Sequence, residues 1–211
     1  ELRRSLPGWS DPEFDAYAER HYPAYWLKTD LARKIQHANL LRLTEVEMRS
    51  LATEVTTDSF RGVTELTVVA PDHPYLLSTI AGACAAGGAN IVDAQVFTTT
   101  DGLALDTISI SREFDMDSDE LRRGKRIAEA IEKSLRGEIK LVDLIKAKAG
   151  ATAGRSDAFT VAPDVVIDNS LSNRATVIEV SGLDRPGLLF DFTNAISKLN
   201  LILASAQVAT F

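Results

Sequence analysis

The sequence predicts an α+β fold, in which one ferredoxin-like βαββαβ unit is followed by the first half of a second unit. An internal repeat is the first reason: residues 72–99 and 184–211 align without gaps at an offset of 112 residues, and such a repeat indicates sister modules. The second reason is the order of hydrophobic patterns, which run as strand, helix, strand, strand, helix, strand. This order is that of the ferredoxin-like arrangement.

The two copies share a turn that opens a helix. The first copy reads Asp-His-Pro-Tyr-Leu-Leu over residues 72–77, and the second reads Asp-Arg-Pro-Gly-Leu-Leu over residues 184–189. Both copies later carry Ala-Gln-Val, at residues 94–96 and 206–208. A helix that begins at such a turn presents free backbone N–H groups and can hold a small anion. Two such turns in sister modules favour a sensor over a catalyst.

The bulk composition restricts the kinds of function that the chain can have. Its 211 residues carry a formal net charge of −7, and 45% of them are hydrophobic, as in a globular chain with a real core. The acidic balance argues against a nucleic-acid partner and against an anionic membrane surface. No apolar run approaches the roughly 20 residues of a membrane span, and the single Cys84 excludes a disulfide framework. We therefore expect a cytoplasmic protein.

Residues 1–50 are predicted to form a helical connector. Ser10 and Glu13 make a capping-box pattern that begins a first helix. Aromatic residues around Pro23 then bend the chain, and a second helix follows from Thr29 with apolar residues at helical spacing. This segment has no pattern of a free-standing domain.

Residues 51–169 are predicted to be the first complete unit. An added strand is expected near its start, at residues 51–57, and Asp101-Gly102 is a strong hairpin signal. Pro74 suits the first turn of a helix because it lacks a backbone N–H group. The elements of the unit are expected at residues 64–70, 74–87, 90–99, 103–111, 118–136 and 159–167, with a further helical stretch at 139–148 and a loop at 149–158.

The second unit, residues 174–211, contains only a strand, a helix and a strand. In a ferredoxin-like sheet these two strands are not neighbours, because a third strand lies between them. We therefore expect a chain that is truncated at both ends, with the empty slot filled by the first module or by another chain. Exchange of this half-unit would give a homodimer.

The repeated turn resembles the signature of the ACT domain, a regulatory module that usually binds amino acids. Residues 21–27, residues 98–102 and the pair Asp106-Thr107 also resemble the C-terminal regulatory region of the bifunctional PII uridylyltransferase/uridylyl-removing enzyme family. In that bacterial family a nucleotidyltransferase domain and a metal-dependent phosphohydrolase domain precede this region. The resemblance therefore implies catalysis and Mg²⁺ in the missing domains, and no catalytic residue or cofactor in this chain.

The resemblance also implies what the chain senses. The family reads glutamine as a measure of nitrogen status, and its partner is the PII signal protein, which it uridylylates when glutamine is scarce and deuridylylates when glutamine is plentiful. A ligand that biases two such activities must bind two domain arrangements with unequal affinity.

The chemistry of the turn predicts how an amino acid would bind. A helix N-terminus favours a carboxylate, Arg185 adds a charge-assisted bond, and Asp184 accepts the ammonium group. Gly187 lets the ligand approach the backbone. In ACT modules, partner residues come from a strand of the neighbouring module. The candidate binding residues are Asp184, Arg185, Pro186, Gly187, Leu188, Asp72, His73, Asn90, Gln95 and Gln207.

Simpler interpretations remain open. Each Asp-x-Pro turn is also a capped turn without a ligand, and Tyr75 stands where the second copy has glycine, so that the first site is altered or empty. The alternative function is a ligand-free ACT-type dimerisation module, or the regulatory domain of another amino-acid-controlled protein. RNA binding is disfavoured, because residues 64–70 and 103–111 contain none of the aromatic residues that RNA-binding sheets of this layout use.

Other chemistry-bearing residues carry structural expectations. Asp115, Asp117 and Asp119 imitate the start of a calcium loop, but the glycine and acid that such a loop needs further on are absent. His21 and His37 have no acidic partners at metal-ligand spacing, and Cys84 lies on an apolar stripe. Trp26 is expected to pack inside the connector.

Overall fold

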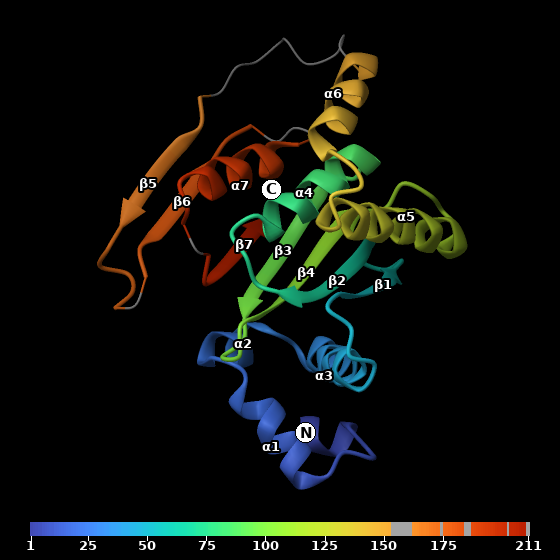
Figure 1. The fold of residues 1–211 in the computed structure, drawn as a ribbon, viewed down its shortest axis with the longest axis vertical. Helices are drawn as coiled ribbons and strands as arrows, with labels where there is room; N and C mark the ends of the chain where they lie inside the picture. Colours follow the sequence, from blue (N-terminus) through green and yellow to red (C-terminus); the bar gives the residue numbers. More distant parts are fainter. Residues whose placement is uncertain (153–161, 174, 184–186, 202, 210–211) are drawn as a thin grey trace.

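The computed structural model describes residues 1–152, 162–173, 175–183, 187–201 and 203–209. A five-stranded sheet forms the centre, with α4, α5, α6 and α7 on one face and the helices of the connector on the other (Figure 1). The elements are η1 (Leu2–Ser5), α1 (Asp11–Glu19), α2 (Pro23–Lys28), α3 (Leu31–Val46), β1 (Ala52–Asp58), β2 (Val63–Pro71), α4 (Leu76–Gly87), β3 (Ile91–Thr98), β4 (Leu103–Ser111), α5 (Asp117–Leu135), α6 (Leu141–Thr152), β5 (Asp164–Asp168), β6 (Val177–Ser181), α7 (Leu188–Lys198) and β7 (Ser205–Ala209).

The main sheet has the order β1-β2-β4-β3-β7, and every neighbouring pair is antiparallel. The central strands β2 and β4 pair over their full length, with Val68 opposite Asp106. The β3–β4 connection is the tight hairpin expected at Asp101-Gly102, and Gly102 has a φ of +83°, which glycine adopts without strain. The predicted α+β, ferredoxin-like arrangement is confirmed.

One predicted strand lies elsewhere than expected. The stretch predicted at residues 159–167 was expected to close the first sheet beside β2, but β1 occupies that edge. The described part of the stretch, β5, pairs with β6 instead. A short hairpin joins β1 to β2, with Asp58 accepting a hydrogen bond from the backbone N–H of Arg61, so this pairing closes a much smaller loop.

The repeat is therefore one strand longer than the sequence indicated. The first copy is β1-β2-α4-β3, and β5-β6-α7-β7 follows in the same order at the same offset. This pairing groups β5 with the second unit rather than with residues 51–169. The division of the chain into 1–50, 51–169 and 174–211 remains a prediction, and the pairing favours a boundary before Asp164.

The two units meet through their equivalent strands. β3 pairs with β7 around Gln95 and Gln207, which occupy the same place in the two copies. On either side, Ala94 faces Val208 and Val96 faces Ala206, so that exchanging the two copies reproduces the same pairs. The contact has an approximate two-fold axis. Within the described ranges, no strand fills the slot between β6 and β7.

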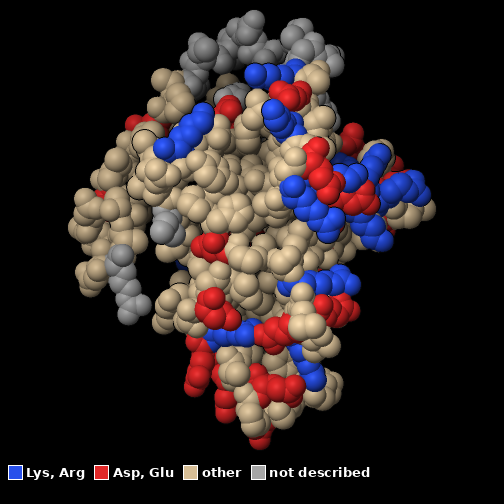
Figure 2. Space-filling model, in the orientation of Figure 1, with Lys and Arg blue, Asp and Glu red and all other residues tan. Residues whose placement is uncertain are grey.

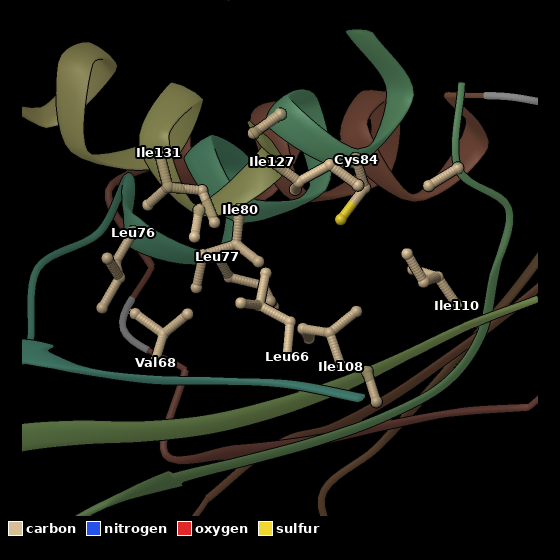
Figure 3. Packing of buried hydrophobic residues seen from close by; sticks show 14 of the residues in the cluster. Leu66, Val68, Leu76, Leu77, Ile80, Cys84, Ile108, Ile110, Ile127 and Ile131 are labelled. Atoms are coloured by element: carbon tan, nitrogen blue, oxygen red, sulfur yellow. The ribbon is translucent and has the colours of Figure 1, made fainter. Parts of the chain in front are cut away.

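A continuous apolar core lies between the sheet and the helices α4 and α5. Figure 3 shows side chains from β2 and β4 meeting those of both helices, with Ile80, Ile108 and Ile131 fully buried. Burial of each such side chain contributes about 1.5–3 kcal/mol. Cys84 belongs to this core, and burial raises the pKa of its thiol to about 12. Its role is packing, as expected from the sequence.

A second core joins the connector to the opposite face of the sheet. The capping box predicted at Ser10 forms, because the backbone N–H of Ser10 donates to the Glu13 carboxylate at 2.7 Å and the Ser10 hydroxyl accepts in return. The aromatic rings of the connector pack on one another and on Phe97 of β3, with Tyr25 almost fully buried. Trp26 packs within this cluster as expected.

Candidate functional site

The first turn is fastened to the end of the β3–β4 hairpin. The backbone N–H of Asp72 donates to the carbonyl of Gly102 at 2.9 Å. The Asp72 carboxylate accepts a hydrogen bond of 2.8 Å from the hydroxyl of Thr98. Asp72 is partly buried and His73 is exposed. The turn therefore moves with the hairpin.

The helix that follows this turn has few free donors left. The backbone N–H of Tyr75 donates to Nδ1 of His73 at 3.3 Å, and the backbone N–H of Leu76 donates to the carbonyl of His73 at 3.0 Å. Tyr75 caps the helix with a φ of −99° and is half exposed. Two of the groups that an incoming carboxylate would use are thus bonded within the turn.

The second turn has a different backbone at the equivalent position. Gly187 caps α7 with a φ of +82°, a conformation that a residue with a side chain rarely adopts. Among the described residues, a β-carbon added there would come within 4 Å only of the side chain of Ala85, at 3.9 Å, so the backbone is approachable from that side. Leu188 is partly buried. The candidate residues Asp184, Arg185 and Pro186 lie outside the described residues.

The two turns are arranged crosswise, because α4 and α7 pack antiparallel. Gly187, at the start of α7, lies near Ala85 at the end of α4. At the other end, the hydroxyl of Ser197 donates to the carbonyl of Pro74 in the first turn at 2.5 Å. Gly187 therefore lies beside the end of α4, and the first turn lies beside the end of α7. The close approach midway depends on Gly82, where a β-carbon would meet Phe190 at 2.9 Å.

This arrangement separates the remaining candidates. Asn90 follows the end of α4, and its carbonyl accepts from the backbone N–H of Ser111 at 2.9 Å. Asn90 therefore lies at the end of the sheet opposite to Asp72 and on the side of Gly187. That it contributes to a ligand site at the second turn remains a prediction.

Gln95 and Gln207 do not face the turns, contrary to the expectation for both. Their neighbours Ala94, Val96 and Ala206 pack into the helix-side core, and successive side chains of a strand point to opposite faces. Gln95 thus points toward the connector, where its Oε1 is buried without a hydrogen-bond partner, and Gln207 is exposed. The alternation of apolar residues around each glutamine was the signal for this placement.

Asp106 is a residue near the first turn that the site prediction missed. It is 1% exposed on the helix side of β4, between Val68 and Val96. Burial, with the nearby charge of Asp72, raises the pKa of the Asp106 carboxyl well above its usual range. One of its oxygens has no hydrogen-bond partner. An aspartate on a strand face that otherwise carries Ala104, Ile108 and Ile110 was the sequence signal that pointed to this position.

The other singled-out residues have structural roles. Burial lowers the pKa of His21 to about 4, and its ring stacks on Tyr25. Two of the acids in the calcium-like stretch are occupied, because Arg112 pairs with Asp117 at 2.5 Å and Arg122 with Asp119 at 3.0 Å. In the described part of the chain, no group of three or more His, Cys, Asp or Glu side chains is placed to hold a metal ion.

Charges of both signs are present on the face of the molecule drawn in Figure 2. Figure 2 shows basic and acidic side chains interspersed over α5, and acidic side chains prominent at the connector end of the same face. None of the helices among the described residues has the length and apolar character needed to cross a membrane.

Known proteins resemble the chain at two levels. A family model described as "ACT domain" matches residues 64–134, which run from β2 through almost all of α5. Over all 211 residues the chain is 60% identical to a protein of Nitrobacter hamburgensis named "Bifunctional uridylyltransferase/uridylyl-removing enzyme". Proteins of the same name from Rhodopseudomonas palustris and Bradyrhizobium diazoefficiens are each 58% identical over the whole chain. The chain spans only 22–23% of the length of these relatives, in their C-terminal part.

Proposed function

Residues 64–134 are an ACT domain, and from this premise we propose that the chain is the amino-acid-sensing region of an enzyme that uridylylates and deuridylylates the PII signal protein. The amino acid is glutamine. When glutamine is scarce the parent enzyme transfers UMP from UTP to PII, and when glutamine is plentiful it hydrolyses the bond. Both reactions, and the Mg²⁺ that supports them, belong to parts of the cytoplasmic parent enzyme outside this chain.

The observation that carries the sensing proposal is the conformation of Gly187. The eleven-residue helix α7 begins at this glycine, so its N-terminus is not covered by a side chain at residue 187. This helix end lies at the contact between two sister units. Such an end combines unpaired N–H groups with the positive end of the helix dipole, which together favour a carboxylate. Asp184 and Arg185 precede it in sequence and suit the ammonium and carboxylate of an α-amino acid.

The second turn is the main site in this proposal. Two N–H groups at the start of α4, those of Tyr75 and Leu76, are already used within the first turn by His73, so Asp72 and His73 form the weaker of the two candidate sites. The crosswise packing adds Asn90 to the second turn, because the end of α4 lies beside Gly187.

Regulation follows from unequal affinity. Glutamine changes the balance of two activities only if it binds one arrangement of the domains more tightly than the other. Coupling of about 1–3 kcal/mol is typical of allosteric proteins and is enough to reverse which activity dominates. The connector, residues 1–50, is the part of the chain best placed to carry the change between the two arrangements.

The two-fold pairing of β3 with β7 favours one alternative function, a ligand-free pairing module. The same register would form between two chains if β7 were exchanged, which would give a homodimer with no ligand at its contact.

Titration calorimetry of the chain with L-glutamine tests the proposal. We expect saturable heat, which weakens at least about tenfold in Gly187→Val because a side chain there strains the backbone and blocks the ligand. Gly137→Val is the matched control, since Gly137 also has a positive φ of +75° with open surroundings and lies after α5. Absence of saturable heat from the folded wild-type chain, together with a stable dimer in sedimentation, would favour the pairing module.

A further inference from the structure

The tip of the β3–β4 hairpin, residues 99–102, is held from two sides. On one side Gly102 accepts from the backbone of Asp72 in the first turn. On the other side the backbone N–H of Thr100 donates to the carbonyl of Arg20 at 2.9 Å, and the Thr100 hydroxyl donates to the carbonyl of Glu19 at 3.4 Å. Figure 1 shows this tip meeting the connector beside α2. The hairpin is thus the bridge between the first turn and the connector.

The bridge is internally stiff. The backbone N–H of Thr99 donates to the carbonyl of Leu103 at 2.7 Å, and the Thr99 hydroxyl accepts from the backbone N–H of Leu103 at 2.9 Å. The backbone N–H of Gly102 donates to the carbonyl of Thr99 at 3.1 Å. A four-residue tip closed by these bonds transmits a displacement rather than absorbing it.

Arg20 forms two ion pairs, one with the hairpin tip and one within the connector. Its guanidinium lies 3.3 Å from the carboxylate of Asp101 and also pairs with Glu45 near the end of α3. Arg20 is the C-cap of α1 and directly precedes the bend at His21. The Arg20 side chain therefore joins the hairpin tip to α3, and its backbone ends α1.

The first turn is also hydrogen-bonded to α7, the helix that begins at the proposed site. Gly187 opens α7, and Ser197 at its other end donates to the carbonyl of Pro74. A helix of eleven residues is rigid enough to move as a rod, so that a shift at Gly187 is felt at Pro74. The contacts then run without a break from Pro74 through Asp72 and the hairpin tip to Arg20.

We propose that this series of contacts is the route by which an amino acid at the second turn repositions the connector, with Arg20 as the positioning residue at its end. The inference rests on the proposed sensing function, because it assumes a ligand at Gly187. It adds to that function the element that carries the signal away from the sheet. Removing the ion pair between Arg20 and Asp101 leaves the ligand bound and weakens the link to the connector, which then depends on the hydrogen bonds of Thr100 to the carbonyls of Arg20 and Glu19.

The chain contains its own reporters for this test. Both of its tryptophans, Trp9 and Trp26, lie in the connector, and the Trp26 ring packs 5.6 Å from the ring of His21, beside Arg20. A change in the position of the connector therefore changes tryptophan fluorescence. Glutamine at the second turn has no tryptophan near it in sequence, so a fluorescence change would report coupling rather than contact.

The experiment measures glutamine binding by calorimetry and the connector by tryptophan fluorescence on the same samples. We expect the fluorescence change at saturating glutamine to fall about fivefold or more in Arg20→Ala, while the affinity for glutamine stays within about twofold of wild type. Asp101→Asn serves as the milder variant if Arg20→Ala unfolds. Arg122→Ala is the matched control, since Arg122 forms an exposed ion pair with Asp119 on α5.

A second measurement needs no ligand and separates the two proposals. Thr98→Val removes the hydroxyl that bonds Asp72, and we expect amide exchange in residues 17–29 to accelerate by about threefold or more, with no change in the matched variant Thr56→Val on β1. That acceleration without any glutamine heat would support the route and overturn glutamine sensing. Glutamine heat with an undiminished fluorescence change in Arg20→Ala and Asp101→Asn would overturn the route.

Discussion

The two faces of the five-stranded sheet differ in chemistry although the same strands form both. On the side of α4 and α5, the strands β2 and β4 present Leu66, Val68, Ile108 and Ile110 to a continuous apolar core, with Thr64 and Asp106 as the buried polar residues of these strands on that side. On the side of the connector the same two strands present buried polar side chains, namely Glu65, Thr67, Thr107 and Ser109.

The contacts of the connector face are correspondingly directional. Arg33 of α3 pairs with Glu65 inside this contact, and both side chains are at least 90% buried. His37 lies between the Tyr25 hydroxyl at 3.2 Å and the Thr107 hydroxyl at 2.9 Å. In the described part of the chain, four of the six buried side-chain polar atoms without a hydrogen-bond partner belong to this face: His21 Nε2, Thr29 Oγ1, Gln36 Nε2 and Gln95 Oε1.

This difference between apolar and polar contacts indicates that the two faces of the sheet have different roles. An apolar core is non-directional and stabilises the fold in one packed arrangement. Contacts between parts that move are more polar than the core of a domain. A buried ion pair adds little to stability, but it fixes the relative position of the two side chains. We infer that the apolar face holds the unit together and that the connector face is the one that rearranges.

The largest effect is expected on the apolar face. Ile108→Ala should lower the free energy of unfolding by about 4 kcal/mol, because the truncation leaves a cavity that the packed core fills only in part. Urea unfolding measures this loss. Leu27→Ala, at a side chain that is 85% exposed, is the control and should change the stability by less than about 0.5 kcal/mol. Equal losses of unfolding free energy in Ile108→Ala and Leu27→Ala would show that the apolar face does not form a tightly packed core.

On the connector face, breaking the ion pair should cost about 3 kcal/mol. Glu65→Ala leaves the Arg33 guanidinium buried without its main partner, and an uncompensated buried charge is expensive. Replacing both residues, with Arg33→Met and Glu65→Leu, should restore most of the stability. A double-mutant cycle by urea unfolding checks this, and additive losses in the double variant would contradict a pair of this kind.

A smaller effect, about 2 kcal/mol, is expected on acidification to pH 5 from His37 alone. Burial lowers the pKa of His37 from the ordinary 6.5 to about 3, so the unfolded chain takes up a proton at a pH where the folded chain does not. Its contribution to stability is complete above pH 6.5 and is lost as the pH falls toward 3, by about 1.4 kcal/mol for each pH unit. His37→Gln should remove this part of the slope in unfolding measured between pH 6.5 and 5. An unchanged slope would mean that His37 is protonated in the folded chain.

The smallest effect concerns the connector by itself. Ser10→Ala removes the capping box of α1 and should cost about 1 kcal/mol. Because Ser10 does not contact the sheet, amide exchange should accelerate in α1 and remain unchanged in α4. Acceleration in α4 would show that the connector and the apolar core are one cooperative unit.

Local patterns were enough to predict most of the elements. The hydrophobic periods located α3, α4, α5 and the central strands, and the Ser10 capping box located the start of α1, because each of these signals acts between residues close in sequence. The partner of β5 was not predictable in this way. A strand pattern predicts that a strand forms but not which strand it pairs with. The pairing depends on which sheet edge the chain can reach with the shortest loop.

The candidate site was predicted in part. The turn sequence identified Gly187, and the structure gives it the left-handed backbone that explains the glycine. Gln95 and Gln207 were named as partner residues of the turns, although the alternation of apolar residues around each one indicates that its side chain points to the opposite face. The contacts of Arg20 and Arg33 join segments far apart in the sequence, and no local pattern announces such pairs before the chain is folded.

Amide hydrogen exchange of the chain with and without glutamine shows whether the connector rearranges while the apolar core stays fixed. We expect the free protein to exchange faster in α3 than in α4, and we expect glutamine to change exchange in residues 17–46 while leaving α4 and α5 near their original rates. Equal protection of the two faces, with no response of the connector to saturating glutamine, would contradict the account.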